Sequence, residues 1–289
     1  MKQHPKSNLW TAVALATVLF ACGGQPAKTN ANEDGADSAL AENRYVKTLH
    51  TADADITWIQ DNAEEKLMPR GLFPDASDSL IDSLSLQDGI PSTVSTFLVQ
   101  TKDGDNLLFD TGLGAPDSRL PAGLEAAGIK PSEITGLYLT HFHGDHIGGM
   151  MKGDSVVFPN AEVYASKVEY DAWMNMPDTQ KASVTKIMEA YKDRLHLFEF
   201  GDTLPGDIVA MEAVGHTPGH TVFQTGKLLI VGDLMHGVAL QKEHPEICAS
   251  FDMDKEAAAA TRRNILKYAR DNALTMAGMH FPAPAFLIK

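Results

Sequence analysis

The chain has 289 residues, a formal net charge of −14 and a hydrophobic content of 44%. That hydrophobic content is ordinary for a globular protein, and the length allows one large domain or two small ones. The excess of acidic residues repels phosphate backbones, so no nucleic acid is expected among the partners.

The N-terminus predicts an export signal. Lys2 and Lys6 precede a mostly apolar run, residues 9–21, which is too short to span the ~30 Å hydrocarbon core of a bilayer. The stretch resembles a bacterial lipoprotein signal, which implies a signal peptide over residues 1–21 and a lipid on Cys22. An ordinary signal peptide with a coincidental cysteine is the alternative.

The composition of residues 22–44 predicts a tether between the lipid and the folded domain. They are rich in Gly, Ala, Asn, Asp and Ser and have almost no bulky apolar side chains, so they cannot bury enough surface to become ordered. The protein is then expected to be exported and anchored to a membrane by its lipid, facing the periplasm or the cell surface.

Strands and helices alternate through the next part of the chain. Strands are predicted over residues 46–50, 56–59, 94–100, 106–110, 136–140 and 162–165, and helices over residues 121–128, 167–174 and 179–193. Residues 62–92 mix apolar residues with many acids and fit no regular element. They form either a lid that shapes the substrate mouth or an edge elaboration far from the site.

A second block of strands follows. It is predicted over residues 195–200, 207–213, 220–225 and 227–231. Residues 254–271 predict an amphipathic helix with an acidic start and basic residues later, as its dipole prefers. Two blocks of strands, each followed by helices, indicate one α/β domain over residues 45–289, built as a four-layer αββα sandwich.

One short stretch contains four side chains that can bind a metal ion. His141, His143, Asp145 and His146 fall within six residues. The first two are two apart, so in an extended segment they point the same way, and a turn at Gly144 would bring the others round to the same point. Imidazole nitrogens and carboxylate oxygens are zinc ligands, and burying four such groups without an ion would be costly. A His-rich surface loop is the alternative.

Further donors recur at the ends of apolar runs. His216 and His220 lie in the stretch Gly-His-Thr-Pro-Gly-His, Asp233 ends the run 228–232, and His280 ends a later one. Residues 141–146 form the pattern HxHxDH. Together with this pattern, the order of motifs resembles that of the metallo-β-lactamase-fold hydrolases over roughly residues 45–289. The nine residues after His280 look short for the strand that family members often add there.

The resemblance implies two zinc ions, with iron or manganese as alternatives, and a role for each residue. Asp110 steadies the metal loop and His220 supports the site without binding. The first metal takes His141, His143 and His216, the second takes Asp145, His146 and His280, and Asp233 bridges the two. A hydroxide shared between the ions attacks the substrate.

The catalytic residues implied are Asp145, Asp233 and His236. Acyl-homoserine lactonases usually have Tyr at the position of His236, whereas relatives similar to methyl parathion hydrolase have His. His236 either assists the developing oxyanion or the leaving group, or only hydrogen-bonds a ligand.

These features place the chain closest to the acyl-homoserine lactonase and methyl parathion hydrolase-like branch. The implied activity is opening of a lactone or cleavage of a related ester in a small-molecule substrate, with phosphotriester cleavage as a side activity. The alternatives are a β-lactamase-like amide hydrolase and a non-catalytic metal-binding lipoprotein. The oligomeric state stays open, a homodimer included.

Overall fold

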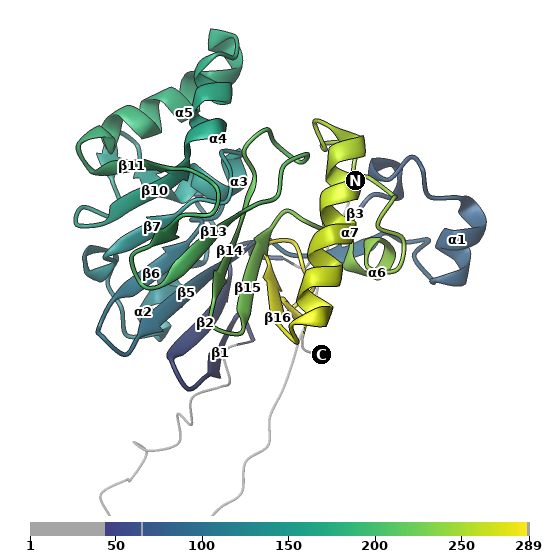
Figure 1. The fold of residues 1–289 in the computed structure, drawn as a ribbon, viewed down its shortest axis with the longest axis horizontal. Helices are drawn as coiled ribbons and strands as arrows, with labels where there is room; N and C mark the ends of the chain where they lie inside the picture. The colour runs from purple at the N-terminus through teal and green to yellow at the C-terminus, as the bar shows by residue number, and fades with distance from the viewer. Residues whose placement is uncertain (1–43, 65, 288–289) are drawn as a thin grey trace, which may run out of the picture. The chain divides into compact units, whose positions relative to one another are not determined.

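The computed structural model describes residues 44–64 and 66–287 (Figure 1). The expected signal peptide, Cys22 and all but the last residue of the expected tether lie outside the described residues. The first described strand, β1, begins at Val46.

A mixed sheet of seven strands forms one half of the domain. Its strand order is β1-β2-β5-β6-β7-β10-β11. The pairs from β1 to β6 are antiparallel, and β7, β10 and β11 add in parallel. The strands are β1 (Val46–His50), β2 (Ala54–Gln60), β5 (Ser95–Thr101), β6 (Asn106–Phe109), β7 (Gly136–Tyr138), β10 (Glu162–Ser166) and β11 (Leu195–Phe198).

A second sheet of six strands faces the first. Its order follows the sequence, and only β15 and β16 pair in parallel. The strands are β12 (Thr203–Leu204), β13 (Ile208–Glu212), β14 (Thr221–Thr225), β15 (Leu228–Gly232), β16 (Thr275–Gly278) and β17 (Phe286–Leu287). Two small two-stranded antiparallel sheets complete the strands, β3 (Lys66–Met68) with β4 (Ile90–Ser92) and β8 (Met151–Lys152) with β9 (Ser155–Val156).

Helices flank the pair of sheets on both sides, with α4 and α5 on one side and α7 on the other (Figure 1). The α-helices are α1 (Asp78–Ser83), α2 (Leu120–Ala126), α3 (Gly144–Ile147), α4 (Lys167–Met174), α5 (Asp178–Ala190), α6 (Val238–Gln241) and α7 (Lys255–Asp271). Short 3₁₀ turns are η1 (Arg70–Leu72), η2 (Pro131–Glu133), η3 (Gly148–Met150) and η4 (Lys192–Arg194).

Side-chain alternation along the strands builds two cores. On β5, Phe97 faces the other sheet and belongs to the cluster that holds Phe223, whereas Leu98 points the opposite way and packs with Leu124 and Val184 from α2 and α5. Both faces of β5 are therefore buried, which explains the three consecutive apolar residues, Phe97, Leu98 and Val99, at its centre. Each fully buried side chain of this size contributes about 1.5–3 kcal/mol to the hydrophobic driving force.

The predicted αββα sandwich is confirmed, with small differences at element ends. Strand β7 stops at Tyr138 because the Thr140 N–H donates to Asp110 Oδ1 at 2.8 Å and leaves the ladder. Helix α7 begins one residue late because Asp254 is its N-cap and accepts from the Ala257 N–H at 2.9 Å. The expectation that the tail lacks a strand is wrong, since β17 pairs with β16.

Within the stretch that the sequence left unassigned, residues 66–92 contribute to a separate small core. Phe73, Ile81 and Ile90 pack there against Leu240 and Ile247. The segment is thus anchored to the chain around α6, which lies near β3 and α1 in Figure 1.

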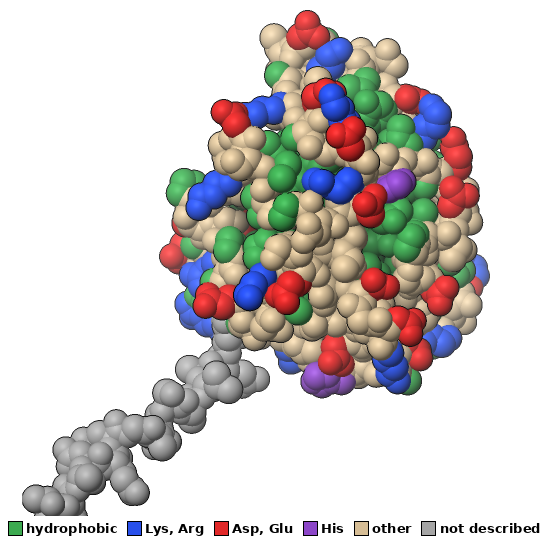
Figure 2. Space-filling model, turned by 90° about the vertical axis from the view of Figure 1, so that its left-hand side faces the viewer, with side chains coloured by type: hydrophobic (Ala, Val, Ile, Leu, Met, Phe, Trp, Pro, Cys, Tyr) green, Lys and Arg blue, Asp and Glu red, His purple; other side chains and the backbone are tan. Residues whose placement is uncertain are grey.

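The surface is mixed in charge. On the face in Figure 2, acidic and basic side chains are interspersed among apolar ones. Within residues 44–64 and 66–287, no helix combines the length and the apolar character needed to cross a bilayer.

Candidate metal centre

The HxHxDH motif occupies the loop after β7 and the start of α3. His143 is the N-cap of α3, so the helical turn itself carries Asp145 and His146 round to the side of His141. Gly144 is the first residue of that helix and does not adopt a positive φ. The expectation that glycine flexibility makes this turn is therefore wrong, since the conformation is one that any residue adopts.

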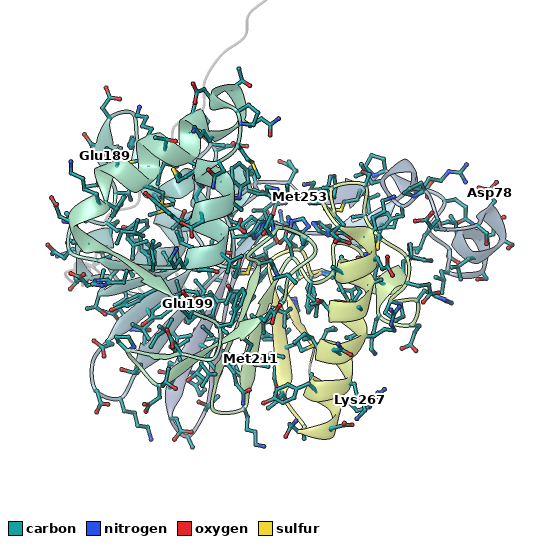
Figure 3. All side chains as sticks on the ribbon, turned by 45° about the horizontal axis from the view of Figure 1, so that its top comes forward. Asp78, Glu189, Glu199, Met211, Met253 and Lys267 are labelled. Carbon is teal, nitrogen blue, oxygen red and sulfur yellow. The ribbon has the colours of Figure 1, made fainter. Side chains whose placement is uncertain are left out.

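The downstream donors reach the same place from the second sheet. His216 lies in the loop between β13 and β14, Asp233 follows β15 directly, and His280 comes two residues after β16. Because β15 and β16 are parallel, their carboxyl ends lie at one edge. Met253, whose N–H donates to the His216 carbonyl at 3.2 Å, marks this edge in Figure 3.

Three imidazoles and a carboxylate form the first cluster. His143 Nδ1 lies 3.0 Å from both His141 Nε2 and His216 Nε2. Asp233 Oδ2 lies 3.2 Å from His216 Nε2 and 3.7 Å from His141 Nε2. The four donor atoms lie within 4.8 Å of one another.

The second cluster adjoins the first. Asp145, His146 and His280 bring one donor atom each to within 4.8 Å of one another. Asp233 also reaches this group, with Oδ1 at 3.1 Å from His146 Nε2 and Oδ2 at 3.2 Å from His280 Nε2. The carboxylate of Asp233 thus stands between the two clusters.

Outer hydrogen bonds fix the imidazole tautomers. The Nδ1–H of His146 donates to Asp110, that of His216 to Asp252 at 3.0 Å, and that of His280 to the Thr93 carbonyl at 2.7 Å. His141 Nδ1 likewise lies 3.0 Å from the hydroxyl of Thr140. When such a ring is neutral, its inward nitrogen carries a lone pair, which is the form that binds a metal.

These residues fit divalent metal ions. Lone pairs only about 3 Å apart repel one another, and His146 Nε2 and Asp233 Oδ1 are buried without any hydrogen-bond partner. A cation between the donors removes both penalties, because tetrahedral zinc with bonds of ~2.0–2.2 Å spaces its ligand atoms by about 3.3 Å. Imidazole and carboxylate also accept iron and manganese, so the donors do not select one metal.

Burial and the neighbouring charges set the protonation of the clusters. Burial and the nearby His216 lower the pKa of His143 to about 4, which keeps this ring neutral at neutral pH. Burial alone would lower the pKa of His280 as well, but the carboxylates of Asp233 and Asp145 outweigh it and raise the pKa to about 9. The same carboxylates would stabilise a metal cation in place of that proton.

Two predicted supporting residues lie behind the clusters. Asp110 accepts from the Thr140 N–H and hydroxyl and from His146 Nδ1, the last at 2.7 Å, so it joins both ends of the metal loop. His220 donates through Nδ1 to the Ala213 carbonyl and accepts the Asp233 N–H at Nε2, both at 3.0 Å. Neither ring nitrogen of His220 is directed at the clusters.

Asp252 and Arg262 are functional residues that the sequence analysis missed. Asp252 Oδ1 lies 3.0 Å from His216 Nδ1, and its other oxygen accepts from Arg262 Nη2 at 3.1 Å. Arg262 also donates through Nε to the Leu234 carbonyl at 2.8 Å, directly after Asp233. The only available signal was Arg262 in the predicted helix, among several small residues. By sequence alone it is indistinguishable from an ordinary basic surface residue.

Glu169 is a third residue that the sequence did not reveal. This buried carboxylate on α4 accepts the Phe142 N–H at 3.0 Å, the Gly219 N–H at 2.8 Å and the Trp173 indole N–H at 2.7 Å. It therefore joins the loop of His141 and His143 to the loop of His216. Burial outweighs these hydrogen bonds and raises the pKa of Glu169.

The clusters open into a cavity of about 390 Å³. Besides candidate ligands and Gly144, it is lined by Lys66, Met68, His236 and Phe251. His236 Nε2 lies 3.1 Å from Asp233 Oδ2, and its ring stacks on that of His280 at a centroid distance of 5.0 Å. The geometry thus aims His236 at a candidate ligand.

The family follows from comparison with known proteins. The Metallo-beta-lactamase superfamily profile matches residues 89–280, about two thirds of the chain. The chain belongs to this superfamily. Its fold and its cluster of histidine and aspartate donors imply divalent metal binding, and the protein is a metal-dependent hydrolase.

Solved structures show the same relationship. AidC, a dizinc quorum-quenching lactonase in complex with a homoserine product, is 27% identical with a TM-score of 0.76, and the match covers 83% of this chain and 92% of AidC. The hydrolase AbOPH is 27% identical with a TM-score of 0.74, over 83% of this chain and 91% of its own.

A quorum-quenching N-acyl homoserine lactone lactonase, 16% identical with a TM-score of 0.58 over 83% of this chain and all of its own, shares the fold. No curated protein sequence matches the chain.

Proposed function

We propose that this protein is a dinuclear zinc hydrolase that opens a lactone or cleaves a related ester. The observation that carries the proposal is the meeting of two donor clusters at the Asp233 carboxylate in an open cavity. The likeness to a dizinc lactonase with bound product supports the choice of an ester over an amide. A cavity of about 390 Å³ suits a small molecule.

The proposal assigns the donors as follows. His141, His143 and His216 hold one ion, Asp145, His146 and His280 hold the other, and Asp233 contacts both. When bound, two such ions supply a hydroxide at neutral pH and polarise the carbonyl oxygen of the ester. Iron or manganese could serve the same donors.

The chain's own residues orient this chemistry. Asp233 is held by its N–H bond to His220 and by His236, whose Nε2 faces Oδ2 at 3.1 Å. In this proposal His236 fixes the Asp233 carboxylate, and a direct part in protonating the leaving oxygen stays a prediction. The products are an acid and an alcohol, since water adds across the ester bond.

The test is a substrate panel with the zinc-loaded protein. We would measure kcat/KM on an acyl-homoserine lactone, a simple γ-lactone, a phosphotriester and a cephalosporin, and metal content by elemental analysis. Lactone turnover that falls about 100- to 1,000-fold in Asp233→Asn, a magnitude typical of losing one catalytic electrostatic group, supports the proposal.

Other outcomes of the panel reject the proposal. A cephalosporin as best substrate would favour the amide hydrolase. Full activity in Asp233→Asn would exclude a metal-bridging role for this residue. Two bound zinc ions with no turnover on any substrate would favour the non-catalytic metal-binding protein.

We also propose that the chain is an exported lipoprotein anchored to a membrane through Cys22. The basic and apolar composition of residues 1–21 and the small residues around Cys22 support this. The full-length chain, expressed in a bacterial host fed radiolabelled palmitate, should carry the label and pellet with membranes. An unlabelled wild-type chain, or equal labelling of Cys22→Ala, would contradict lipidation at this residue.

A further inference from the structure

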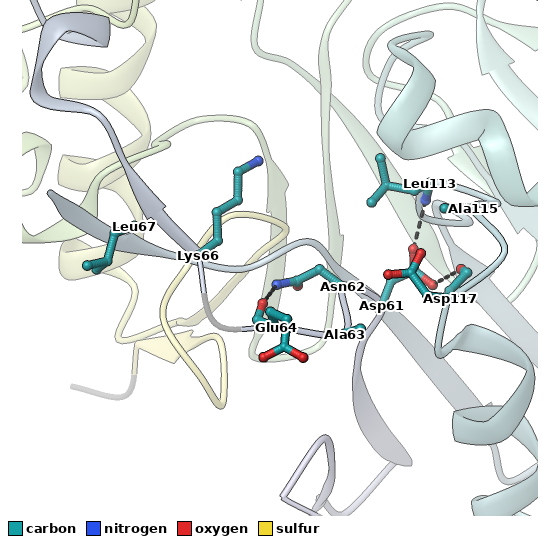
Figure 4. A pocket seen from close by; sticks show the side chains of 10 residues that line it. Asp61, Asn62, Ala63, Glu64, Lys66, Leu67, Leu113, Ala115 and Asp117 are labelled. Atoms are coloured by element: carbon teal, nitrogen blue, oxygen red, sulfur yellow. Dashed lines mark hydrogen bonds between the residues drawn. The ribbon is translucent and has the colours of Figure 1, made fainter. Parts of the chain in front are cut away.

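One basic side chain, that of Lys66, lines the cavity over the clusters. Lys66 is the only lysine or arginine among its lining residues, and it is also the only one lining an adjoining cavity of about 380 Å³. Figure 4 shows this second cavity, where the Lys66 side chain extends away from the Glu64 carboxylate. Among the described residues, no carboxylate lies within ion-pair distance of the Lys66 ammonium.

The position of Lys66 is fixed relative to the clusters. Lys66 on β3 pairs with Ser92 on β4, and the Ser92 hydroxyl donates to the His280 carbonyl at 3.2 Å. The next residue, Thr93, accepts from His280 Nδ1 at 2.7 Å. One strand therefore separates Lys66 from the segment that holds a candidate ligand. Strand pairing fixes the backbone of Lys66 beside the site, and its side chain is exposed.

Strand alternation gives β3 two different faces. Lys66 and Met68 both line the cavity over the clusters, as residues two apart on a strand do. Leu67, between them, lines only the adjoining cavity and is 53% exposed. Lys66 thus marks the passage between the two cavities.

An ammonium without an ion-pair partner among the described residues does little at this place for a neutral substrate. The two carboxylates of the clusters are neutralised when divalent ions are bound, so Lys66 then adds to a positive field. The chain has a net charge of −14, so most of its surface repels anions. A local positive field at the cavity favours the binding of anionic molecules there.

We propose that the substrate carries an anionic group, a carboxylate set apart from its scissile ester, and that Lys66 binds this group. The inference rests on the proposed lactone or ester hydrolysis and names its substrate class. The ester lies over the clusters, and the carboxylate of the substrate meets Lys66, which lines the same cavity.

Binding tests the inference without turnover. The zinc-loaded full chain would be titrated calorimetrically with succinate, glutarate and adipate, each against the monocarboxylate of equal length. We expect at least one dicarboxylate to bind about fivefold tighter than its partner, the upper range for an ion pair at an open site. Lys66→Met should bring this ratio close to one, and Lys66→Arg should keep it.

Lys152→Met is the matched control. Lys152 is an exposed lysine that lines a different cavity, so its loss changes the net charge equally but should leave the ratio as in the wild type. A wild-type ratio of one overturns the inference. So does an equal loss of affinity for both acids in Lys66→Met, because that pattern indicates a structural role.

Turnover separates this inference from the proposed function. Two γ-lactones would be compared, one with a carboxylate on its side chain and one with a primary amide in its place. The ratio of their kcat/KM values should favour the carboxylate in the wild type and fall about fivefold in Lys66→Met. If neither lactone is hydrolysed but the dicarboxylate preference holds, the lactonase proposal fails and the role of Lys66 stands.

Discussion

Arg262 Nη2 lies 3.1 Å from Asp252 Oδ2, and both side chains are shielded from solvent. The opposite oxygen of Asp252 accepts from His216 Nδ1, so Arg262 acts on this candidate ligand through Asp252. The guanidinium holds the carboxylate in one orientation, and the carboxylate holds the imidazole with its Nε2 lone pair toward the cluster.

Asp252→Asn should weaken metal binding. The amide oxygen can still accept from His216, but it carries no charge, and Arg262 is left buried without a counter-ion. We expect zinc affinity to fall about 10–100-fold, and the folded state to lose roughly 3–5 kcal/mol. Competition with a chromophoric chelator measures the first, and denaturant unfolding the second.

Asp154→Asn is the control for this variant. Asp154 pairs with Lys186 on the surface with 94% of its side chain exposed, so the same chemical change should have almost no effect there. Zinc affinity in Asp252→Asn equal to that of the control would remove Asp252 from the description of the site.

Glu169→Gln should loosen the join between the two metal loops. The carboxylate accepts from Phe142, Gly219 and Trp173, and an amide in its place turns one acceptor into a donor that faces another N–H. We expect a loss of about 1–3 kcal/mol in unfolding free energy, measured in urea. Glu189→Gln, on the exposed side of α5, is the matched change and should stay within about 0.5 kcal/mol. Equal unfolding free energies of the two variants would show that the hydrogen bonds of Glu169 do not stabilise the fold.

The sequence predicted the candidate ligands because they come in short motifs. His141, His143, Asp145 and His146 are neighbours in the chain, and the others stand at the ends of apolar runs, so local patterns indicate them. The αββα layers followed from the same patterns, because strands buried on both faces read as continuous apolar runs.

Residues that act through tertiary contacts left no such signal. Asp252 meets His216 across 36 residues and Glu169 meets Gly219 across 50, and each is an isolated acid in its own segment. Very short strands were missed for a different reason. Two residues, as in β12 and β17, are too few to show an alternation, and only pairing with a neighbour defines them.

Glycines of the metal loop illustrate the same limit and give a further prediction. A Cβ at Gly149 would lie 2.0 Å from the Thr111 carbonyl oxygen, whereas one at Gly144 would meet nothing within 4 Å. Gly149→Ala should therefore force two backbone segments apart, and we expect a loss of about 1–3 kcal/mol in unfolding free energy, as for other overpacked sites. Gly144→Ala should be neutral or stabilising by up to about 1 kcal/mol. Thermal unfolding of the two metal-free variants compares them, and the reverse order would contradict the close approach of the loops.

The final prediction concerns pH. In the metal-free protein the carboxylates of Asp233 and Asp145 outweigh burial and raise the pKa of His280 to about 9, above the ordinary value of 6.5. The proton on His280 therefore stabilises the metal-free fold fully below about pH 6.5, and this contribution is lost as the pH rises through about 9. Zinc needs the same nitrogen unprotonated, so the metal and the proton compete. The rise in Tm on adding zinc should consequently be small near pH 6 and grow toward pH 8.5, and a chelator should abolish it at every pH. His196→Gln, which alters only an exposed imidazole paired with Glu162, should leave this trend as it is. A zinc-dependent rise in Tm that is constant across this range, or larger in acid, would mean that zinc binds elsewhere than at His280.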